Sequence, residues 1–429
     1  MVRVRGSDTY VGVQLAIEAT WGTMPGSPTW MQVPIVEDSV HVEADTVAKD
    51  QELGQVGAQA VFNHGPQTVK GSLTINPRYN LKVFSVLMAH FMGGSESRNA
   101  DVLPNGTAQV GLYSTHCWMP QSYQSTAAGS ESGVAPGLSG QFFRSGPTQG
   151  GTVEQYVGIV PVRMRWTQTK DARPTVTFDF IGIKHPTAHI LSAAGLAKVA
   201  VPASIPLGAR DVGNRGTSGV THANLPGLSI TGITNLGVPT QLALSNLTGF
   251  SFTAENGIEF APAFANLPDS PAKPGHVTQW TVTGELQSLL STTWVSDLYT
   301  PAFLYNTGAS RLLVRIRYTS NSNADPAATI TNGEVTVPYV FDIYFKNVQF
   351  SAVRKEIQRG GAIETVAPFE CAKTPNGFGY GIDTGLPGAS ARLGMMLLQA
   401  TASDADDGGT TYALAVEGGN DGNTDLNQI

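Results

Sequence analysis

Residues 68–73 read TVKGSL and residues 281–286 read TVTGEL. Their first positions, Thr68 and Thr281, are 213 residues apart, and in both segments Val, Gly and Leu alternate with polar residues. This alternation is typical of a β-strand that buries one face. A Gly on the buried face of both strands indicates that a neighbouring backbone or ring lies close to it. The two segments therefore predict one strand that occurs twice in the chain.

A helical pattern follows each of these strands. Residues 81–91 place apolar side chains at helical spacing and end before Gly93 and Gly94. In the second half, residues 292–299 show the same spacing, and Pro301 ends the pattern. We expect one short amphipathic helix after each strand.

Two further strand pairs complete the repeat. Residues 156–167 and 175–183 alternate in the first half, and residues 339–345 and 363–371 do so in the second half. Each half thus predicts the order strand, helix, strand, strand.

The offset between the two halves changes along the chain. Residues 40–44 match residues 250–254 with an offset of 210, whereas Tyr156 matches Tyr339 with an offset of 183. The first half therefore holds about 30 additional residues after its helix. Residues 127–152 contain seven Gly and two Pro, which favours a long loop in that interval, either functional or disordered.

These patterns predict a mainly β fold of two tandem β-barrel or sandwich domains, each with one flanking α-helix. The first domain is expected at residues 1–195, with a long loop over residues 94–155, and the second at residues 196–378. Residues 379–429 form an acidic C-terminal extension. The total of 429 residues agrees with two to three domains.

The composition supports a β protein that is rich in turns. The chain contains 48 Gly and 26 Pro, and 14% of its residues are charged, against about 25% in an average soluble domain. This excludes a coiled coil, a helical bundle and an acidic disordered chain. The formal net charge is −7, whereas a static nucleic-acid binder normally carries a basic excess.

The C-terminal extension carries most of the negative charge. Residues 379–429 contain seven acidic residues and one Arg. Residues 395–400 and 410–416 alternate around the turn-rich segment 404–409, which predicts one hairpin. The sequence DADDGG of that segment is similar to a calcium loop, but Ala415 stands where a bidentate Glu belongs. We therefore interpret it as a solvated acidic turn.

No catalytic, cofactor-binding or metal-binding motif is recognisable. The chain has no Gly-x-Ser-x-Gly elbow, no P-loop and no His-Glu-x-x-His. His185 and His189 are spaced i, i+4, but Pro186 lies between them, so we interpret them as loop residues. Residues 377–381 (GFGYG) predict a turn, because no strand–helix unit surrounds them. We expect neither an enzyme nor a bound cofactor.

The tryptophans and cysteines are interpreted as core residues. Trp166, Trp280 and Trp294 lie on alternating or helical apolar faces, which favours core packing over a carbohydrate-binding platform. Cys117 and Cys371 are too few for a disulfide framework or a zinc site. No apolar stretch is long enough to cross a membrane, and the N-terminus shows no signal peptide.

The N-terminal segment is similar to a known family. Residues 11–23 read VGVQLAIEATWGT. This stretch resembles the start of the tail tube (major tail) proteins of long-tailed bacteriophages, in which an E-x-x-W-G-T motif precedes a turn and further strands. Residues 33–40 and the first strand and helix described above fit the next elements of that family. The resemblance covers about residues 10–95 directly and reaches residues 240–372 through the repeat.

The resemblance implies a structural virion protein. Tail tube proteins have a β-barrel or sandwich domain with a flanking helix and form rings that stack into a tube, the conduit for genome delivery. The implied partners are other copies of this chain, other tail proteins at the tube ends and, transiently in the lumen, the tape measure protein and DNA. The implied location is the virion tail after synthesis in the host bacterial cytoplasm, with no membrane and no cofactor.

Two domains per chain favour a ring of three chains. A homotrimer supplies six domains and predicts a pseudo-hexameric ring. With about four strands per domain, the barrel would have roughly 24 strands, more than the 16–18-stranded porins that already enclose a channel. Closing the ring would also remove exposed sheet edges. We expect a neutral to negative lumen, because a basic wall would hold DNA phosphates.

Three residues of the turn-rich stretch are candidates for contacts between subunits. Leu138, Phe142 and Phe143 are apolar residues on an otherwise polar segment, and we expect them to anchor it on a neighbouring subunit. The alternative is a mobile surface loop.

A second candidate contact is a basic strand. Arg311, Arg315 and Arg317 lie on one face of an alternating segment. A solvated face and an inter-subunit salt-bridge face both remain open.

Two other functions compete with a tube subunit. One is a two-domain virion decoration or receptor/glycan-binding β protein, and the other is a β-rich glycan-active enzyme. Such an enzyme needs paired carboxylates on facing strands, and the sequence assigns no such pair.

Overall fold

β-Strands make up most of the residues that the structure describes, as the sequence predicts. The computed structural model describes residues 11–48, 62–79, 82–92, 96–99, 113–118, 137–144, 151–169, 172–194, 196–201, 204–208, 228–234, 240–243, 247–260, 275–276, 280–289, 310–323, 338–357, 363–371 and 396–403. Within these residues there is one helix, α1 (Lys82–Met92).

The strands of the N-terminal half are the following: β1 (Gly12–Ile17), β2 (Met31–Val33), β3 (Ile35–Asp38), β4 (His41–Ala48), β5 (Phe62–Ile75), β6 (Glu96–Asn99), β7 (Tyr113–Trp118), β8 (Leu138–Phe143), β9 (Thr152–Thr169), β10 (Thr175–Lys184) and β11 (Ile190–Ser192). Their main pairing order is β2–β1–β8–β9–β10–β5, and β3 and β4 lie in tandem along the last edge of β5. All of these pairs are antiparallel.

The strands of the C-terminal half are the following: β12 (Leu228–Thr234), β13 (Thr240–Ala243), β14 (Leu247–Glu255), β15 (Ile258–Glu259), β16 (Gly275–His276), β17 (Thr281–Leu289), β18 (Ser310–Asn323), β19 (Pro338–Phe350), β20 (Arg354–Ile357), β21 (Ile363–Cys371) and β22 (Met396–Ser403). Their main order is β13–β12–β18–β19–β21–β17–β14, again antiparallel. β20 follows β19 along the same edge of β21.

The two halves also share the positions of two β-bulges. The β3–β5 pairing shifts its register just after Ile35, and the β14–β17 pairing does so just after Leu247. The β8–β9 and β18–β19 pairings shift just after Leu138 and Leu312. A bulge inserts one residue into a ladder and so marks a specific position. The pairing orders and the bulges therefore correspond strand for strand.

The registers give residue-level correspondences between the halves. Gly71 of β5 pairs with Phe180 of β10, and Gly284 of β17 pairs with Phe369 of β21. Gly71 and Gly284 are 213 positions apart, as predicted, whereas Phe180 and Phe369 are 189 positions apart.

The offset of 183 expected for the later strands is therefore wrong by six residues. Tyr156 pairs with Gly140, the first pair beyond the bulge of the β8–β9 ladder, and Phe345 pairs with Val314, the first pair beyond the bulge of the β18–β19 ladder. Tyr156 therefore corresponds to Phe345 and not to Tyr339. A shift by an even number of residues preserves the alternation of a strand. The sequence pattern alone could not separate these alignments.

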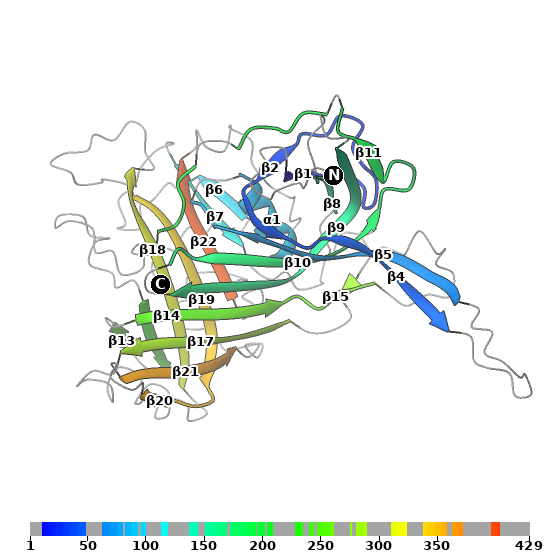
Figure 1. Ribbon diagram of the computed structural model, residues 1–429. Coiled ribbons are helices and arrows are strands. Elements are labelled where there is room, and N and C mark those ends of the chain that lie inside the picture. The colour runs from blue at the N-terminus through cyan, green and yellow to red at the C-terminus, as the bar shows by residue number, and fades with distance from the viewer. Residues whose placement is uncertain are drawn as a thin grey trace, which may run out of the picture.

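The two halves join through β9 and β14. The N-terminal part of β9 pairs with β8, and the C-terminal part pairs with β14, where Trp166 lies opposite Phe252. Eight strands, in the order β4–β5–β10–β9–β14–β17–β21–β20, therefore form one continuous sheet across both halves (Figure 1). We name this sheet the front layer.

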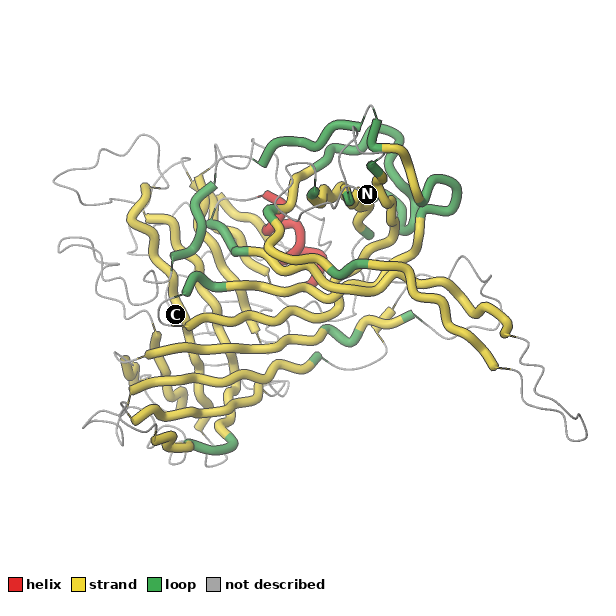
Figure 2. Tube along the Cα trace, viewed as in Figure 1, coloured by secondary structure: helices red, strands yellow, loops and turns green. Residues whose placement is uncertain are grey.

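The core lies between the front layer and strands that cross behind it (Figure 2). Trp166 is fully buried and stacks on Phe252 of β14 and Phe341 of β19, with ring centroids 6.0 and 5.5 Å apart. Its indole Nε1 donates a hydrogen bond to the Tyr318 hydroxyl of β18 at 3.0 Å. Burying these rings stabilises both halves together, because aromatic side chains bury the most apolar area per residue.

α1 confirms the first predicted helix. It spans Lys82–Met92 against the expected residues 81–91, and residues 83–92 are buried except Ser85, which is partly buried. Its Phe84 ring packs on Phe341 at 5.8 Å. The second expected helix, at residues 292–299, lies outside the described residues.

The expected long loop is wrong in part, because it contains a core strand. β8 lies within residues 127–152 and pairs with β1 on one edge and β9 on the other. Leu138, Phe142 and Phe143 are only 0%, 1% and 4% exposed, so they pack in their own chain. Gly and Ser between the apolar residues of β8 concealed its alternation. The expected arm with these three anchors is replaced by a buried strand.

β22 corrects the hairpin expected in the C-terminal extension. It pairs with β19 on one side and with β7 on the other, so both of its edges have partners other than a hairpin strand. Both of its partners are distant in sequence. Residues 404–429, with the acidic turn, lie outside the described residues.

Candidate functional site

The outer face of the front layer is a polar surface that spans both halves. Its side chains alternate with core residues, since successive residues of a strand point to opposite faces. They are small hydroxyl residues and charged residues: Lys70, Ser72 and Thr74 of β5; Thr175, Thr177 and Asp179 of β10; Arg163, Arg165 and Thr167 of β9; Ser251, Thr253 and Glu255 of β14; Thr281, Thr283 and Glu285 of β17.

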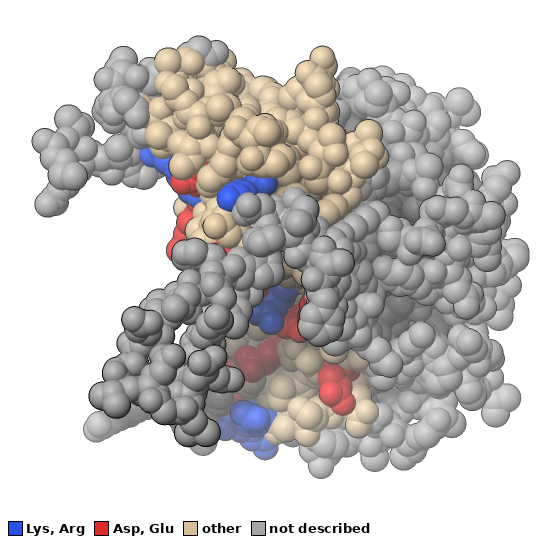
Figure 3. Space-filling view, turned by 90° about the vertical axis from the view of Figure 1, so that its right-hand side faces the viewer, with Lys and Arg blue, Asp and Glu red and all other residues tan. Residues whose placement is uncertain are grey.

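Carboxylates neutralise the basic groups at the centre of this face. Arg163 pairs with Glu255 at 2.6 Å and with Asp179 at 3.4 Å, and Arg165 pairs with Asp179 at 2.7 Å. The Arg163–Glu255 pair bridges the junction between the halves. These pairs are solvent-exposed and each contributes about 0–1 kcal/mol. Their main effect is a face with mixed charge. Figure 3 draws a neighbouring side of the molecule, where Lys and Arg likewise lie next to Asp and Glu.

An ion pair of the same kind lies near the β4 end of the face. Lys70 of β5 contacts Glu43 of β4 at 2.7 Å. The hydrogen bond and the charge of Lys70 hold the pKa of Glu43 below its usual value. Glu43 therefore stays ionised at neutral pH.

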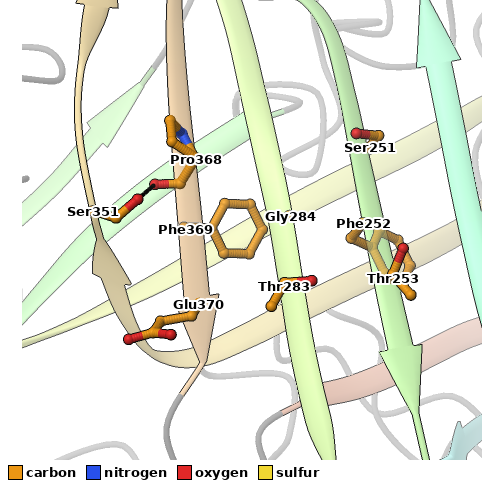
Figure 4. A pocket seen from close by; sticks show the side chains of 9 residues that line it. All are labelled: Ser251, Phe252, Thr253, Thr283, Gly284, Ser351, Pro368, Phe369 and Glu370. Carbon is orange, nitrogen blue, oxygen red and sulfur yellow. Dashed lines mark hydrogen bonds between the residues drawn. The ribbon is translucent and has the colours of Figure 1, made fainter.

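A shallow depression on this face surrounds Gly284 (Figure 4). The Phe369 ring lies against Gly284, and the carbonyl oxygen of Ser251 would be 2.8 Å from a Cβ atom at this position. The expected close approach to the repeated glycine is thus confirmed here. Hydroxyl groups and the single carboxylate of Glu370 line the depression, which lacks the paired carboxylates of a glycosidase.

The E-x-x-W-G motif holds the turn after β1. Glu18 is 1% exposed and accepts hydrogen bonds from the Gly22 and Gly158 amides and the Ser139 hydroxyl, at 2.7, 2.8 and 2.8 Å. Burial raises its pKa, although the three hydrogen bonds oppose the shift. Trp21 Nε1 donates to the Gly158 carbonyl at 3.1 Å. The motif therefore fixes local structure.

A partly buried ionic cluster holds the β3–β4 edge. Arg144 contacts Asp38 of β3, donates to Glu154 of β9 at 2.9 Å and donates to the Val40 carbonyl at 2.7 Å. The Tyr156 hydroxyl donates to Glu154 at 2.8 Å. Burial opposes the charge of Arg144, but its two carboxylate partners outweigh this and raise its pKa. Arg144 was absent from the sequence-based candidates, because its partners lie 106 and 10 residues away.

The other expected candidates lie on separate elements. Arg311, Arg315 and Arg317 lie on β18, whose backbone pairs with β12 and β19, and their side chains lie outside the described part of the structure. Beyond the end of β10, His185 Nδ1 accepts a hydrogen bond from the Ala188 amide, and His189 Nδ1 is hydrogen-bonded to the Gln155 carbonyl of β9.

The expected core residues agree where they are described. Trp166 is buried, Trp280 packs against the core, and Cys371 is a buried free thiol whose pKa is raised by burial. The side chains of Cys117 and Trp294 lie outside the description.

The described residues were also searched for metal and membrane features. Among them, no group of three or more His, Cys, Asp or Glu residues could hold a metal ion. No helix in the described ranges is long and apolar enough to span a membrane.

Comparison with protein families gives a match over most of the chain. A family model described as phage tail tube protein matches residues 11–367, a stretch that includes both halves of the fold. A comparison with curated proteins gave no match.

Proposed function

We propose, for a chain that belongs to the phage tail tube protein family, that three copies close into a ring and that such rings stack into the tail tube. Membership of this family makes the chain a structural phage protein of the tail tube rather than an enzyme. It also favours a tube subunit over the virion decoration and the receptor- or glycan-binding protein that the sequence left open. The ring, its symmetry and its role as a genome conduit are the proposal.

The matching strand orders of the two halves are the observation that carries the proposal. Seven strands of each half pair in the same order, with bulges at the same two places. This supports two copies of one tube domain, at residues 1–195 and 196–378, with residues 379–429 as an extension. Three chains then supply six domains, the number expected for the ring.

The front layer supports a barrel of the required size. Each chain contributes eight strands to it, and three chains would contribute about 24. In this arrangement the polar outer face would line the lumen. Its hydroxyl groups and paired charges give DNA and the tape measure protein little to adhere to, because only unpaired basic groups hold phosphates strongly.

The β4–β5 hairpin supports contact between rings. Its two strands continue beyond the body of the molecule as an arm (Figure 2). An arm that projects from a ring is placed to reach the next ring or another tail protein at the tube end. A head-to-tail contact of this kind repeats without limit along an axis.

Electron microscopy of the purified protein with mass measurement of its rings tests the proposal. We expect stacked rings with three chains each and six similar density lobes. Rings of six chains would overturn the trimer. A protein that stays monomeric under all conditions would overturn the tube.

A further inference from the structure

The junction inside the chain shows how one half adds to the other. Residues 163–169 of β9 pair antiparallel with residues 249–255 of β14, and Arg165 lies opposite Thr253. This pairing extends the front layer from the first half into the second half without a break.

Both strands of this junction have counterparts at the ends of the front layer. Thr253 of β14 pairs with Thr283, and His41 of β4 pairs with Lys70, which lies 213 positions before Thr283. β3 and β4 together therefore correspond to β14. By the same reasoning β20 corresponds to the C-terminal part of β9. Arg165 pairs with Thr177 of β10, and Arg354 pairs with Val366 of β21, 189 positions later than Thr177.

Each counterpart strand pairs along one edge only. Within the described residues, β3 and β4 pair with β5, and β20 pairs with β21. β4 and β20 are the first and last of the eight strands of the front layer (Figure 1). At about 4.8 Å per strand they are separated by roughly 34 Å along the sheet, so a chain does not pair them with each other.

We infer that β20 of one chain adds to the β3–β4 edge of a second copy, in the register of the β9–β14 junction. His41 of one chain would then lie opposite Arg354 of the other, and Glu43 would lie opposite Ala352. This inference rests on the proposed function and names the strands that close the ring. The polar face would continue from chain to chain.

The charges of the two edges are complementary. The β3–β4 edge carries Glu37, Asp38 and Glu43, of which Asp38 and Glu43 also contact Arg144 and Lys70 of their own chain. β20 begins with Arg354 and Lys355, both exposed, and continues with Glu356. In the register above, Glu43 is a diagonal neighbour of Arg354, and such pairs are within reach of long side chains. Opposite charges across the edges favour this partner over pairing of two like edges, where the charges would repel.

The backbone of the β3–β4 edge is also fixed before a partner strand adds to it. Arg144 binds the Val40 carbonyl and the Asp38 carboxylate, which fixes the backbone between β3 and β4 to β8 and β9. An edge with a fixed backbone loses less conformational entropy when a strand adds to it.

Cysteine cross-linking of the full chain tests the register. The double variant His41→Cys, Arg354→Cys places two thiols on opposite strands of the inferred junction, where Cα separations of about 4.5–5.5 Å permit a disulfide. Under mild oxidation we expect dimers and trimers linked between chains, about ten-fold more abundant than in the chain without added cysteines. Absence of these products from assembled rings would overturn the inference.

Two control pairs make the result specific. Thr253→Cys, Arg165→Cys is the corresponding pair of the β9–β14 junction and should link within one chain, whether or not rings form. His41→Cys, Lys355→Cys shifts the register by one residue and places the thiols on opposite faces, so it should give less than about a tenth of the linked product. Equal linking by the shifted pair would contradict the register.

The outcomes separate the inference from the proposed function. Rings without interchain links would refute the junction and leave the tube intact. Links that continue beyond three chains would support the junction and refute the trimer. Monomers with only the β9–β14 control link would refute both.

Discussion

The β9–β14 junction and the outer edges of the front layer share a backbone pattern but differ in side chains. At the junction, Trp166, Phe252 and Tyr318 are 0%, 2% and 0% exposed and pack together. The junction forms once, during folding of a single chain. Aromatic residues are suited to it because they never face water.

The corresponding positions of the outer edges are mostly charged. Lys355 takes the place of Trp166, Val40 that of Phe252, and Arg144 that of Tyr318, according to the shared registers. An edge that meets water before assembly aggregates if it is apolar, and charged residues on edge strands prevent this. The comparison teaches that strands with the same pairing pattern can carry aromatic residues at a junction inside the chain and charged residues at an edge of the same sheet.

The largest expected effect comes from breaking the aromatic junction. Trp166→Ala should lower the free energy of unfolding by about 3–5 kcal/mol, because it leaves a large cavity between three rings. Lys355→Ala, at the corresponding exposed edge position, should lower it by no more than about 1 kcal/mol. Urea unfolding measures both values. Similar losses of unfolding free energy in the two variants would show that the junction and the edge position contribute equally to stability.

The repeated glycines give the next largest effect. Gly71 has a φ of +139°, and a Cβ atom there would lie 2.5 Å from the Ser39 carbonyl oxygen and the Val40 Cα. Gly71→Ala should therefore destabilise the chain by about 2–4 kcal/mol, since the β3–β4 backbone would have to move. Gly284→Ala meets mainly the Phe369 ring and should cost about 1–3 kcal/mol.

Thermal melting with calorimetry would rank these glycine variants. Gly26→Ala is the matched control, because nothing lies within 4 Å of a Cβ atom at that position. If Gly284→Ala lowered the melting temperature more than Gly71→Ala, the backbone of the β3–β4 edge would not be held more tightly than that of β14 at the junction.

Removal of Arg144 should have an intermediate effect. Arg144→Ala leaves Asp38 and Glu154, whose side chains are 10% and 28% exposed, without their cation. We expect a loss of about 1–3 kcal/mol, measured by urea unfolding, and fewer assembled rings. Arg163→Ala, whose side chain is 45% exposed, should cost no more than about 1 kcal/mol. Equal costs would mean that the Arg144 cluster is as solvated as the outer face.

The smallest effect on stability should accompany a clear effect on assembly. Arg354→Glu is expected to change the free energy of unfolding by less than about 0.5 kcal/mol, yet to reduce ring yield about five-fold by placing like charges across the inferred contact. Glu43→Lys in the same chain should restore the yield. Sedimentation measures the yield of assembled rings. An unchanged yield in both single variants would show that charge pairing does not contribute to the inferred contact between chains.

Several elements were predictable because their signals are local. The Val–Gly–Leu alternation of residues 68–73 predicted β5, and helical spacing predicted α1 within one residue. The buried position of Trp166 followed from its place on an alternating strand. These signals depend only on the period of one segment, which its own residues determine.

Other elements were not predictable for stated reasons. β8 contains Ser139 and Gly140 between apolar residues, so it resembles a loop until β1 and β9 are seen on its two edges. β22 pairs with strands from both halves, and no local pattern reports such partners. The Arg144 cluster joins β3, β8 and β9, and only the fold brings these residues together.

The sequence by itself determined the β class, the repeated strand, the first helix, the family resemblance and the scarcity of free basic groups. Each of these rests on composition or on short-range periodicity. Only the tertiary structure decided the register of the later strands, the joining of the halves through β9 and β14, and which of the described strands form the two ends of the front layer. The physical reason is that a strand specifies which of its faces is buried, whereas its partner and register depend on all the strands that compete for its edges.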